Sequence, residues 1–513
     1  MTLKDLLSIV NTDAKFNFHA PHNVEKAISF FNELVNMHSA KVISKIDCDV
    51  DGIFSNKILQ NSWRKLGLTS PSRTINFYFN EKKSHEIDSV FIKMVLDEGY
   101  THVILLDSSS NCMEQLEELS RNGIKVLIID HHLMDYSESD YPTNVVIINN
   151  KFKEDEEIVN ISAGFLTFLV MSMVCRSIRG SKPDMMDYVR GAVTLISDSC
   201  DTTDPYIMPI ILGLTALQEI PLEVVVFLDQ YTKLNRNFLT FKHNNIINNL
   251  CRLNKYKELH RFYFEGITPE EMLEMVKDFK ELNKKTREER EALLEKSNEF
   301  CEDWGSVIFV DLDKADSLTS LSREYLENST GVIGSMVSNK YGKATVSLIS
   351  FDNLTYKGSG RSLDESFDWH KMMSIVDIDG GGHIGAVGFK LQKHSLGDLK
   401  DYLKGLEFSK PKPSCIVLNV NNCKVGDIAS IGEKIAIYNE IHFGEYKKVL
   451  LSVNLSRNFR VFKYKKAQDF VAGDLRIKDT SGEHMYGDNV LIEPELNKIG
   501  HFLINDREAA LLT

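Results

Sequence analysis

Three aspartates at alternate positions stand out as residues that could do chemistry. Asp47, Asp49 and Asp51 lie in the segment DCDVDG, directly after a short apolar run and before a helical pattern that opens at Gly52. Carboxylates this close repel one another strongly, and divalent cations relieve that repulsion. DCDVDG also matches the start of an EF-hand loop, but such a loop ends in a glutamate. Ile58 occupies the position of that glutamate, which argues against a calcium loop.

Further acidic and imidazole side chains follow other apolar runs. Asp107 ends the run in LLDSSS, Asp130, His131 and His132 end the run in LIIDHH, and Asp198 follows the run in LISDSCD. One aspartate after a strand is often an N-cap, but three successive runs ending in aspartate favour a shared site. Carboxylates with one or two imidazoles favour Mn²⁺ or Mg²⁺ over thiolate-bound zinc. Bridging carboxylates favour two ions about 4 Å apart, an arrangement that supports phosphoester hydrolysis.

Alternating strands and helices must position these side chains. Apolar runs predict strands at 41–46, 103–106, 125–129 and 145–148, and helical patterns lie at 52–66 and 113–121. This alternation predicts an α/β fold with a doubly wound parallel sheet over residues 1–208. Ligands of such sheets bind where the strands end, so we expect the aspartates and histidines to converge at that edge.

The remaining chain divides into three parts. Residues 209–302 are mainly helical, and Thr268, Pro269 and Glu271 predict the capped start of a long connecting helix. Residues 303–408 form a second α/β segment. Residues 409–513 contain short β-type runs at 415–420, 434–438, 448–453 and 460–464, which predict a β-rich, OB-like domain.

The charge distribution limits how the chain could bind nucleic acid. The formal net charge of −13 excludes a uniformly basic surface but leaves room for a local basic groove. Between positions 446 and 478 there are nine basic and two acidic residues, with five aromatic residues among them. Basic residues could follow a phosphate backbone while aromatic rings stack on bases. A solvated barrel face around aromatic core residues explains this composition equally well.

Composition also bears on compartment. The apolar runs are too short to cross a bilayer, and the start of the chain has no signal-peptide pattern, so we expect a cytoplasmic protein without membrane contact. The eight cysteines form no CxxC pair, which argues against a zinc ribbon and favours reduced thiols.

The motifs together resemble the DHH phosphoesterases. DCDVDG, the LLDSS around Asp107, the DHH at 130–132 and Asp198 are similar to that family's four ordered motifs. GSGRS at 358–362 and GGGH at 380–383 resemble the marks of its DHH-associated domain. Within the family the chain looks most like the RecJ exonucleases, whose first motif is similar to DCDVDG. Lys45 stands where the small oligoribonuclease-type members (NrnA-like) carry a histidine.

The resemblance implies a role for each site residue. It aligns Asp49 and Asp51 with the family's metal-binding pair, and Asp47 would then be an outer ligand or a hydrogen-bond partner. Asp107 would bridge two Mn²⁺ ions, with Mg²⁺ as an alternative. His131 and Asp198 complete the coordination. Asp130 would orient a ligating histidine, and His132 would contact the scissile phosphate or protonate the leaving oxygen. Six residues of the associated domain would bind substrate: Ser359, Arg361, Ser362, Gly381, Gly382 and His383.

The same resemblance implies a function and leaves alternatives open. It implies a single-strand-specific 5′–3′ exonuclease that releases mononucleotides in DNA repair, recombination or replication, with a single-strand-binding protein or a helicase as possible partners. One alternative is hydrolysis of short RNA oligomers, cyclic dinucleotides or 3′-phosphoadenosine phosphate. Another is a scaffold without catalysis in a replication complex, although every expected ligand position is filled.

Overall fold

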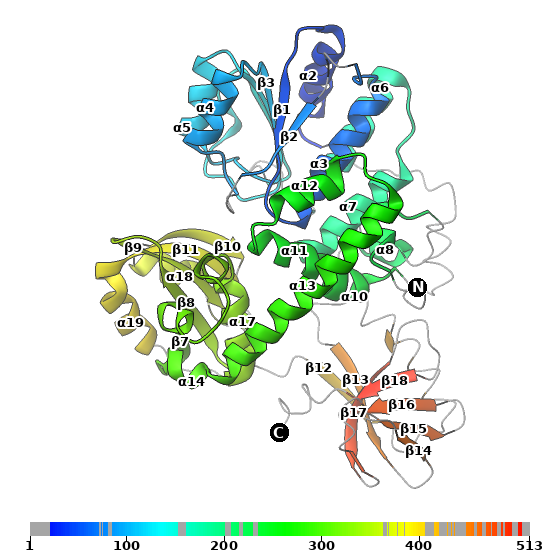
Figure 1. Cartoon of the computed structure of the whole chain (residues 1–513), viewed down its shortest axis with the longest axis vertical. Helices are drawn as coiled ribbons and strands as arrows, with labels where there is room; N and C mark the ends of the chain where they lie inside the picture. The colour runs from blue at the N-terminus through cyan, green and yellow to red at the C-terminus, as the bar shows by residue number, and fades with distance from the viewer. Residues whose placement is uncertain are drawn as a thin grey trace.

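In a computed structural model, the described residues form three β-sheets with flanking helices (Figure 1). The structure describes residues 21–70, 73, 75–80, 85–151, 161–200, 207–214, 219–228, 234–362, 367, 369–376, 378–383 and 385–405. In the C-terminal part it describes 415–419, 428, 432, 435–436, 448–455, 459–463, 468–472, 475–479, 484–485, 488–494 and 501–504. Within these residues, no helix is long and apolar enough to cross a membrane.

The first sheet is parallel and has five strands in the order β2-β1-β3-β4-β5. Its strands are β1 (Val42–Lys45), β2 (Ile75–Tyr78), β3 (His102–Leu106), β4 (Lys125–Asp130) and β5 (Val145–Asn149). The predicted strands are confirmed, whereas β2 was not predicted. Its four residues are only partly buried or exposed, so they lack the continuous apolar run of a central strand.

Helices cover both faces of this sheet, as the doubly wound prediction requires. The helices of this region are α2 (Val24–Asn36), α3 (Val50–Lys65), α4 (Ser89–Asp97), α5 (Met113–Arg121), α6 (Ala163–Arg179) and α7 (Met185–Ser197). Alternate residues of β3 enter different cores: Ile104 packs with α2, α3 and α6, and Val103 packs with α4 and α5. Burial on both faces explains why the central strands read as unbroken apolar runs.

A helical region follows and shares the first of these cores, which extends to Phe279. It contains α8 (Ile207–Gly213), α9 (Leu222–Val225), α10 (Arg236–Phe238), a π-helical turn (Leu239–Asn244), α11 (Asn245–Arg252), α12 (Tyr256–Phe264), α13 (Pro269–Glu295) and α14 (Ser297–Phe300). The predicted capping box is present at α13, where Thr268 and Glu271 cap each other's backbone N–H groups. Figure 1 shows α13 running from this region to the second sheet.

The second sheet is mixed and has the order β10-β11-β9-β8-β7-β6. Its strands are β6 (Cys301–Asp303), β7 (Val307–Asp311), β8 (Ala344–Ser350), β9 (Thr355–Arg361), β10 (Asp379–His383) and β11 (Ala386–Gln392). Its helices are α15 (Leu312–Asp316), α16 (Arg323–Asn328), α17 (Thr330–Tyr341), α18 (Trp369–Val376) and α19 (Leu396–Lys404). This confirms a second α/β unit after the helical region.

The C-terminal part is a seven-stranded, mainly antiparallel sheet with the order β12-β13-β17-β18-β16-β15-β14. Its strands are β12 (Cys415–Asn419), β13 (Lys448–Asn454), β14 (Arg460–Lys463), β15 (Gln468–Ala472), β16 (Leu475–Asp479), β17 (Asn489–Pro494) and β18 (His501–Ile504). The β-rich prediction is confirmed. The strand predicted at 434–438 is wrong where it is described, because Ile435 and Ala436 are helical. Short apolar runs do not distinguish a strand from a buried helical turn.

Candidate metal centre

The loop between β1 and α3 is built to hold carboxylates close together. Asp49 is the N-cap of α3, and its Oδ1 accepts a hydrogen bond of 3.1 Å from the N–H of Gly52. A Cβ at Gly52 would lie 2.5 Å from the Cβ of Asp47, so only glycine lets the loop turn this tightly. Asp47 is 2% exposed and Asp51 is 1% exposed. The loop therefore buries negative charge that needs a counter-charge.

Asp51 is fixed by the start of a second helix. Its two carboxylate oxygens accept hydrogen bonds from the N–H groups of Ala163, at 2.9 Å, and Gly164, at 2.7 Å, in the first turn of α6. A Cβ at Gly164 would lie 2.9 Å from Asp51 Oδ1. The positive end of α6 stabilises the carboxylate and sets its orientation.

Asp107 follows β3 in an unusual backbone conformation. Its φ is +66°, in the left-handed region that most residues with a side chain avoid, and its side chain is buried. Ser109, two residues later, also has a positive φ, of 71°. Strained backbone of this kind is found at functional sites, where the surrounding structure holds it in place.

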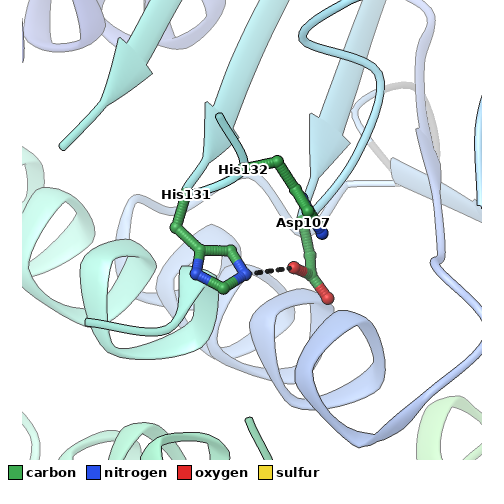
Figure 2. A group of neighbouring side chains, drawn as sticks. All are labelled: Asp107, His131 and His132. Atoms are coloured by element: carbon green, nitrogen blue, oxygen red, sulfur yellow. Dashed lines mark ion pairs between the residues drawn. The ribbon is translucent and has the colours of Figure 1, made fainter. Parts of the chain in front are cut away.

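His131 brings carboxylates from three different segments together. Its Nε2 lies 3.2 Å from Asp198 Oδ2, 3.3 Å from Asp107 Oδ1 and 3.9 Å from Asp51 Oδ2. Figure 2 shows the His131 ring at the end of its strand with Nε2 directed at Asp107. Asp198 is the C-cap residue of α7. The predicted convergence at the carboxyl edge of the sheet is thus present in the structure.

The electrostatics of this cluster favour a bound cation. Burial raises the pKa of Asp49, Asp51 and Asp107, and the neighbouring carboxylates raise it further. Burial also lowers the pKa of His131, so its imidazole is neutral, as a metal ligand must be. A divalent cation would relieve the carboxylate repulsion and restore the charged form of each aspartate.

Asp130 holds the neighbouring histidine. Its Oδ1 accepts hydrogen bonds from the backbone N–H of His131, at 2.7 Å, and from Nδ1 of His132, at 2.8 Å, while its Oδ2 accepts one from Ser110 Oγ. Burial alone would lower the pKa of His132, but the hydrogen bond to Asp130 and its charge raise that pKa to about 9. Asp130 therefore positions the ring of His132, whose side chain is 59% exposed, and touches only the backbone of His131.

Three groups of described side chains could each hold a metal ion. They are Asp51 with His131 and Asp198, Asp107 with His131 and His132, and Asp47 with Asp49 and His85. In each group the ligand atoms lie within 4.8 Å of one another. Carboxylate and imidazole donors of this kind fit Mn²⁺ or Mg²⁺. His85 was not predicted, since no local pattern marks it.

The predicted substrate residues lie on or next to two strands of the second sheet, β9 and β10, which β11 separates. Ser359 and Arg361 are in β9, and Ser359 Oγ lies 2.8 Å from Thr330 Oγ1. Ser362 follows β9 and donates its backbone N–H to Gly385 O at 3.0 Å. Gly381, Gly382 and His383 belong to the edge strand β10, not to the loop expected for a glycine-rich segment, and they pair with Gly388, Val387 and Ala386.

Backbone carbonyls hold the Arg361 guanidinium in place. Its Nη1 donates to Gly360 O at 2.7 Å and to Val387 O at 2.9 Å, and the group packs over Gly331 in the first turn of α17. Burial and the charge of Arg252 lower the pKa of Arg361 to about 10. Within the described residues, no carboxylate lies at ion-pair distance from it.

The sequence analysis did not identify two further arginines: Arg252, whose charge acts on Arg361, and Arg290, whose charge acts on Arg252. Arg252 lies at the end of α11. Burial and the charge of Arg290 lower its pKa, whereas the charge of Asp49 acts to raise it. Arg290 of α13 is 7% exposed, and its Nε has no hydrogen-bond partner. Of the ion pairs that the described chain forms, none includes these arginines. An anion bound among these arginines would offset the repulsion between their charges.

Helix α11 connects this arginine group to the aspartate loop. Asn248 Oδ1 accepts the N–H of Val50 in the first turn of α3, at 3.3 Å. On the other side, Asn249 Oδ1 accepts the hydroxyl of Tyr325 at 2.9 Å, and the backbone O of Arg252 accepts Asn328 Nδ2 at 3.1 Å. No spacing within the segment NNLCRL marks Arg252 as a site residue, because its position depends on these contacts with distant segments.

Comparisons with known proteins agree with this geometry. Residues 41–190 match the DHH family, N-terminal domain. The putative SPbeta prophage-derived single-strand DNA-specific exonuclease YorK of Bacillus subtilis (strain 168) is 23% identical over 203 residues, which span 39% of this chain and 33% of that relative.

Two solved structures show the same fold over nearly the whole chain. RecJ of Thermus thermophilus in complex with Mn²⁺ has a TM-score of 0.72 and 14% identity, and the match covers 96% of this chain and 72% of RecJ. The complex of the same protein with Mg²⁺ has a TM-score of 0.61 and 13% identity, with coverage of 95% and 69%.

Proposed function

We propose that this chain, whose residues 41–190 match the N-terminal domain of the DHH family, is a metal-dependent phosphodiesterase that degrades single-stranded DNA from the 5′ end to mononucleotides. The observation that carries the proposal is the position of His131 Nε2, within 3.2–3.9 Å of carboxylates from three segments. The DNA substrate is supported by the names of the relatives, YorK and RecJ, and is part of the proposal.

In this proposal two ions, Mn²⁺ or Mg²⁺, are held by one shared set of ligands: Asp47, Asp49, Asp51, Asp107, His131 and Asp198. When bound, such ions neutralise phosphate charge and activate water for attack on phosphorus. His132, cationic at neutral pH and half exposed, would contact the scissile phosphate and deliver a proton to the leaving oxygen. Asp130 would keep that ring in place.

The arginines would fix the end of the strand. Arg361 and Arg252 present guanidinium groups without carboxylate partners, and Arg252 is close enough to Asp49 to feel its charge. A terminal phosphate there would be bound through charge-assisted hydrogen bonds. Residues 1–208 would then supply the metals and residues 303–408 the end contact, with Ser359, Ser362 and the 381–383 segment beside it.

A substrate panel tests this function. Purified full-length protein with Mn²⁺ or Mg²⁺ is incubated with long single-stranded DNA labelled at either end, duplex DNA, short RNA oligomers and a cyclic dinucleotide. We expect mononucleotide release from the 5′ end of single-stranded DNA. Preference for short RNA or for the cyclic dinucleotide would contradict the proposal, and absence of both Mn²⁺ binding and hydrolysis would point to a scaffold.

Matched variants connect the activity to the site. Asp107→Asn removes one carboxylate charge at the cluster, and Asp278→Asn makes the same change at an exposed position of α13. Hydrolysis should disappear in the first variant and persist in the second. Equal activity in both variants would show that the observed hydrolysis comes from another site or from a contaminant.

A further inference from the structure

His85 reaches the aspartate loop from a segment that has no part in the family motifs described above. It lies between β2 and α4, and its backbone O accepts a hydrogen bond of 3.1 Å from Lys45 Nζ, at the end of β1. Two residues later, the N–H of Ile87 donates to Ser109 Oγ at 3.1 Å. The segment is thus attached to the two loops that carry Asp47 and Asp107, and its position beside them is fixed.

The His85 ring is placed as a metal ligand would be. Its Nδ1 lies 2.8 Å from Asp47 Oδ2. One ligand atom from each of His85, Asp47 and Asp49 lies within 4.8 Å of the other two. Neighbouring ligands of an octahedral ion with bonds of about 2.1 Å are about 3 Å apart, and opposite ligands are about 4.2 Å apart. The three side chains are therefore close enough for one ion to bind all of them after small shifts.

A second observation indicates a missing cation rather than a simple ion pair. The other oxygen of Asp47, Oδ1, is buried and has no hydrogen-bond partner, although the residue is only 2% exposed. A His–Asp pair would use Oδ2 alone and leave Oδ1 uncompensated, which is costly for a buried carboxylate. A cation between Asp47, Asp49 and His85 would compensate the whole carboxylate.

We propose that His85 is an imidazole ligand of one of the two metal ions, at the position formed by Asp47 and Asp49. The assignment rests on the proposed two-metal site, whose other position has His131 as its imidazole. Lys45, the last residue of β1, holds the backbone of His85 in place through its ammonium group. A nitrogen ligand at both positions favours a transition-metal ion over Mg²⁺, which prefers oxygen ligands.

The test counts imidazoles around bound Mn²⁺. Metal-free full-length wild type, His85→Gln, His131→Gln and the double variant are titrated with Mn²⁺ by calorimetry, and the ¹⁴N couplings of the bound ion are measured by pulsed electron paramagnetic resonance. His394→Gln, at an exposed position of the second α/β unit, is the control. Thermal unfolding of each variant checks folding, which His85→Gln should preserve because the side chain is 53% exposed.

We expect two imidazole couplings in the wild type and in His394→Gln, one in each single variant and none in the double variant. His85→Gln should also weaken one of the two Mn²⁺ sites by at least tenfold and change Mg²⁺ affinity less. If His85→Gln keeps both couplings and both affinities, His85 is not a ligand. If the wild type binds two ions with two imidazoles but degrades no nucleic acid, the proposed function fails while this assignment stands.

Discussion

Arg361→Met isolates the contact proposed for the end of the strand. The substitution removes a guanidinium that backbone carbonyls hold in place and keeps an apolar stem over Gly331. Because Arg252 and Arg361 disfavour each other's charge, the free protein loses a repulsive interaction. We therefore expect the variant to fold and to bind Mn²⁺ as the wild type does.

The size of the effect follows from the bonds that would be lost. Hydrogen bonds to charged groups contribute about 1.5–3 kcal/mol each, and losing a two-bond contact that water partly replaces weakens phosphate binding by about 2–4 kcal/mol. This corresponds to about a 30- to 1000-fold loss of kcat/KM on 5′-phosphorylated single strands. Strands with a 5′-hydroxyl group cannot make the contact and should lose much less.

The assay compares both strand ends in three proteins. Wild type, Arg361→Met and Arg323→Met are each assayed on 5′-phosphorylated and 5′-hydroxyl strands of the same sequence. Arg323 is the matched control, since it lies in the same unit but pairs with Asp313, Asp316 and Glu327. If Arg361→Met keeps the wild-type ratio between the two ends, Arg361 does not bind the terminal phosphate.

Three further predictions concern the metal site and the fold. Asp107→Asn should keep the left-handed backbone at this position, because asparagine tolerates it. The variant should lose hydrolysis, and it should lose the stabilisation that Mn²⁺ binding gives, about 2.7 kcal/mol at a hundredfold excess over Kd. A rise of the variant's melting temperature with Mn²⁺ would refute this prediction. Burial lowers the pKa of Lys57 to about 8. Below pH 8 the buried side chain is charged and destabilises the folded state, and this destabilisation decreases as the side chain loses its proton between pH 8 and pH 10. The stability of the wild type relative to Lys57→Met, from urea unfolding, should therefore rise by up to about 3 kcal/mol between pH 7 and pH 10, and an unchanged difference would contradict the burial argument. Thr268→Ala should destabilise the protein by about 1 kcal/mol through loss of the α13 cap, measured by the same unfolding, whereas Thr319→Ala in a loop serves as the control.

The central strands of the first sheet could be predicted because burial on both faces leaves a continuous apolar run in the sequence. β3 and β4 are covered on both faces, so every residue from Val103 to Leu106 must be apolar, and each strand shows as an unbroken run. The aspartates that follow such runs must meet at one edge. The fold therefore positions Asp107 and His131 by rules that a sequence alone reveals.

What could not be predicted depends on contacts between distant segments. β2 is an edge strand with partly exposed residues, so the sequence shows no clear apolar run there. His85 follows β2 in the chain and comes to lie beside Asp47 through tertiary packing. Arg252 comes from a helix that contacts both α3 and the second unit. No spacing within either segment encodes these approaches, which tertiary packing alone determines.

The glycines of the second unit differ in whether the packing of the sheet requires them. A Cβ at Gly358 would collide with Phe389, one at Gly360 with Trp369, and one at Gly380 with the backbone of Gly388. These three glycines are therefore required by packing of the sheet, and not by a ligand. Gly381 differs, because a Cβ there would meet nothing within 4 Å. Packing within the sheet therefore leaves room for a side chain at Gly381, on the edge strand β10, so this glycine is not explained by the fold alone.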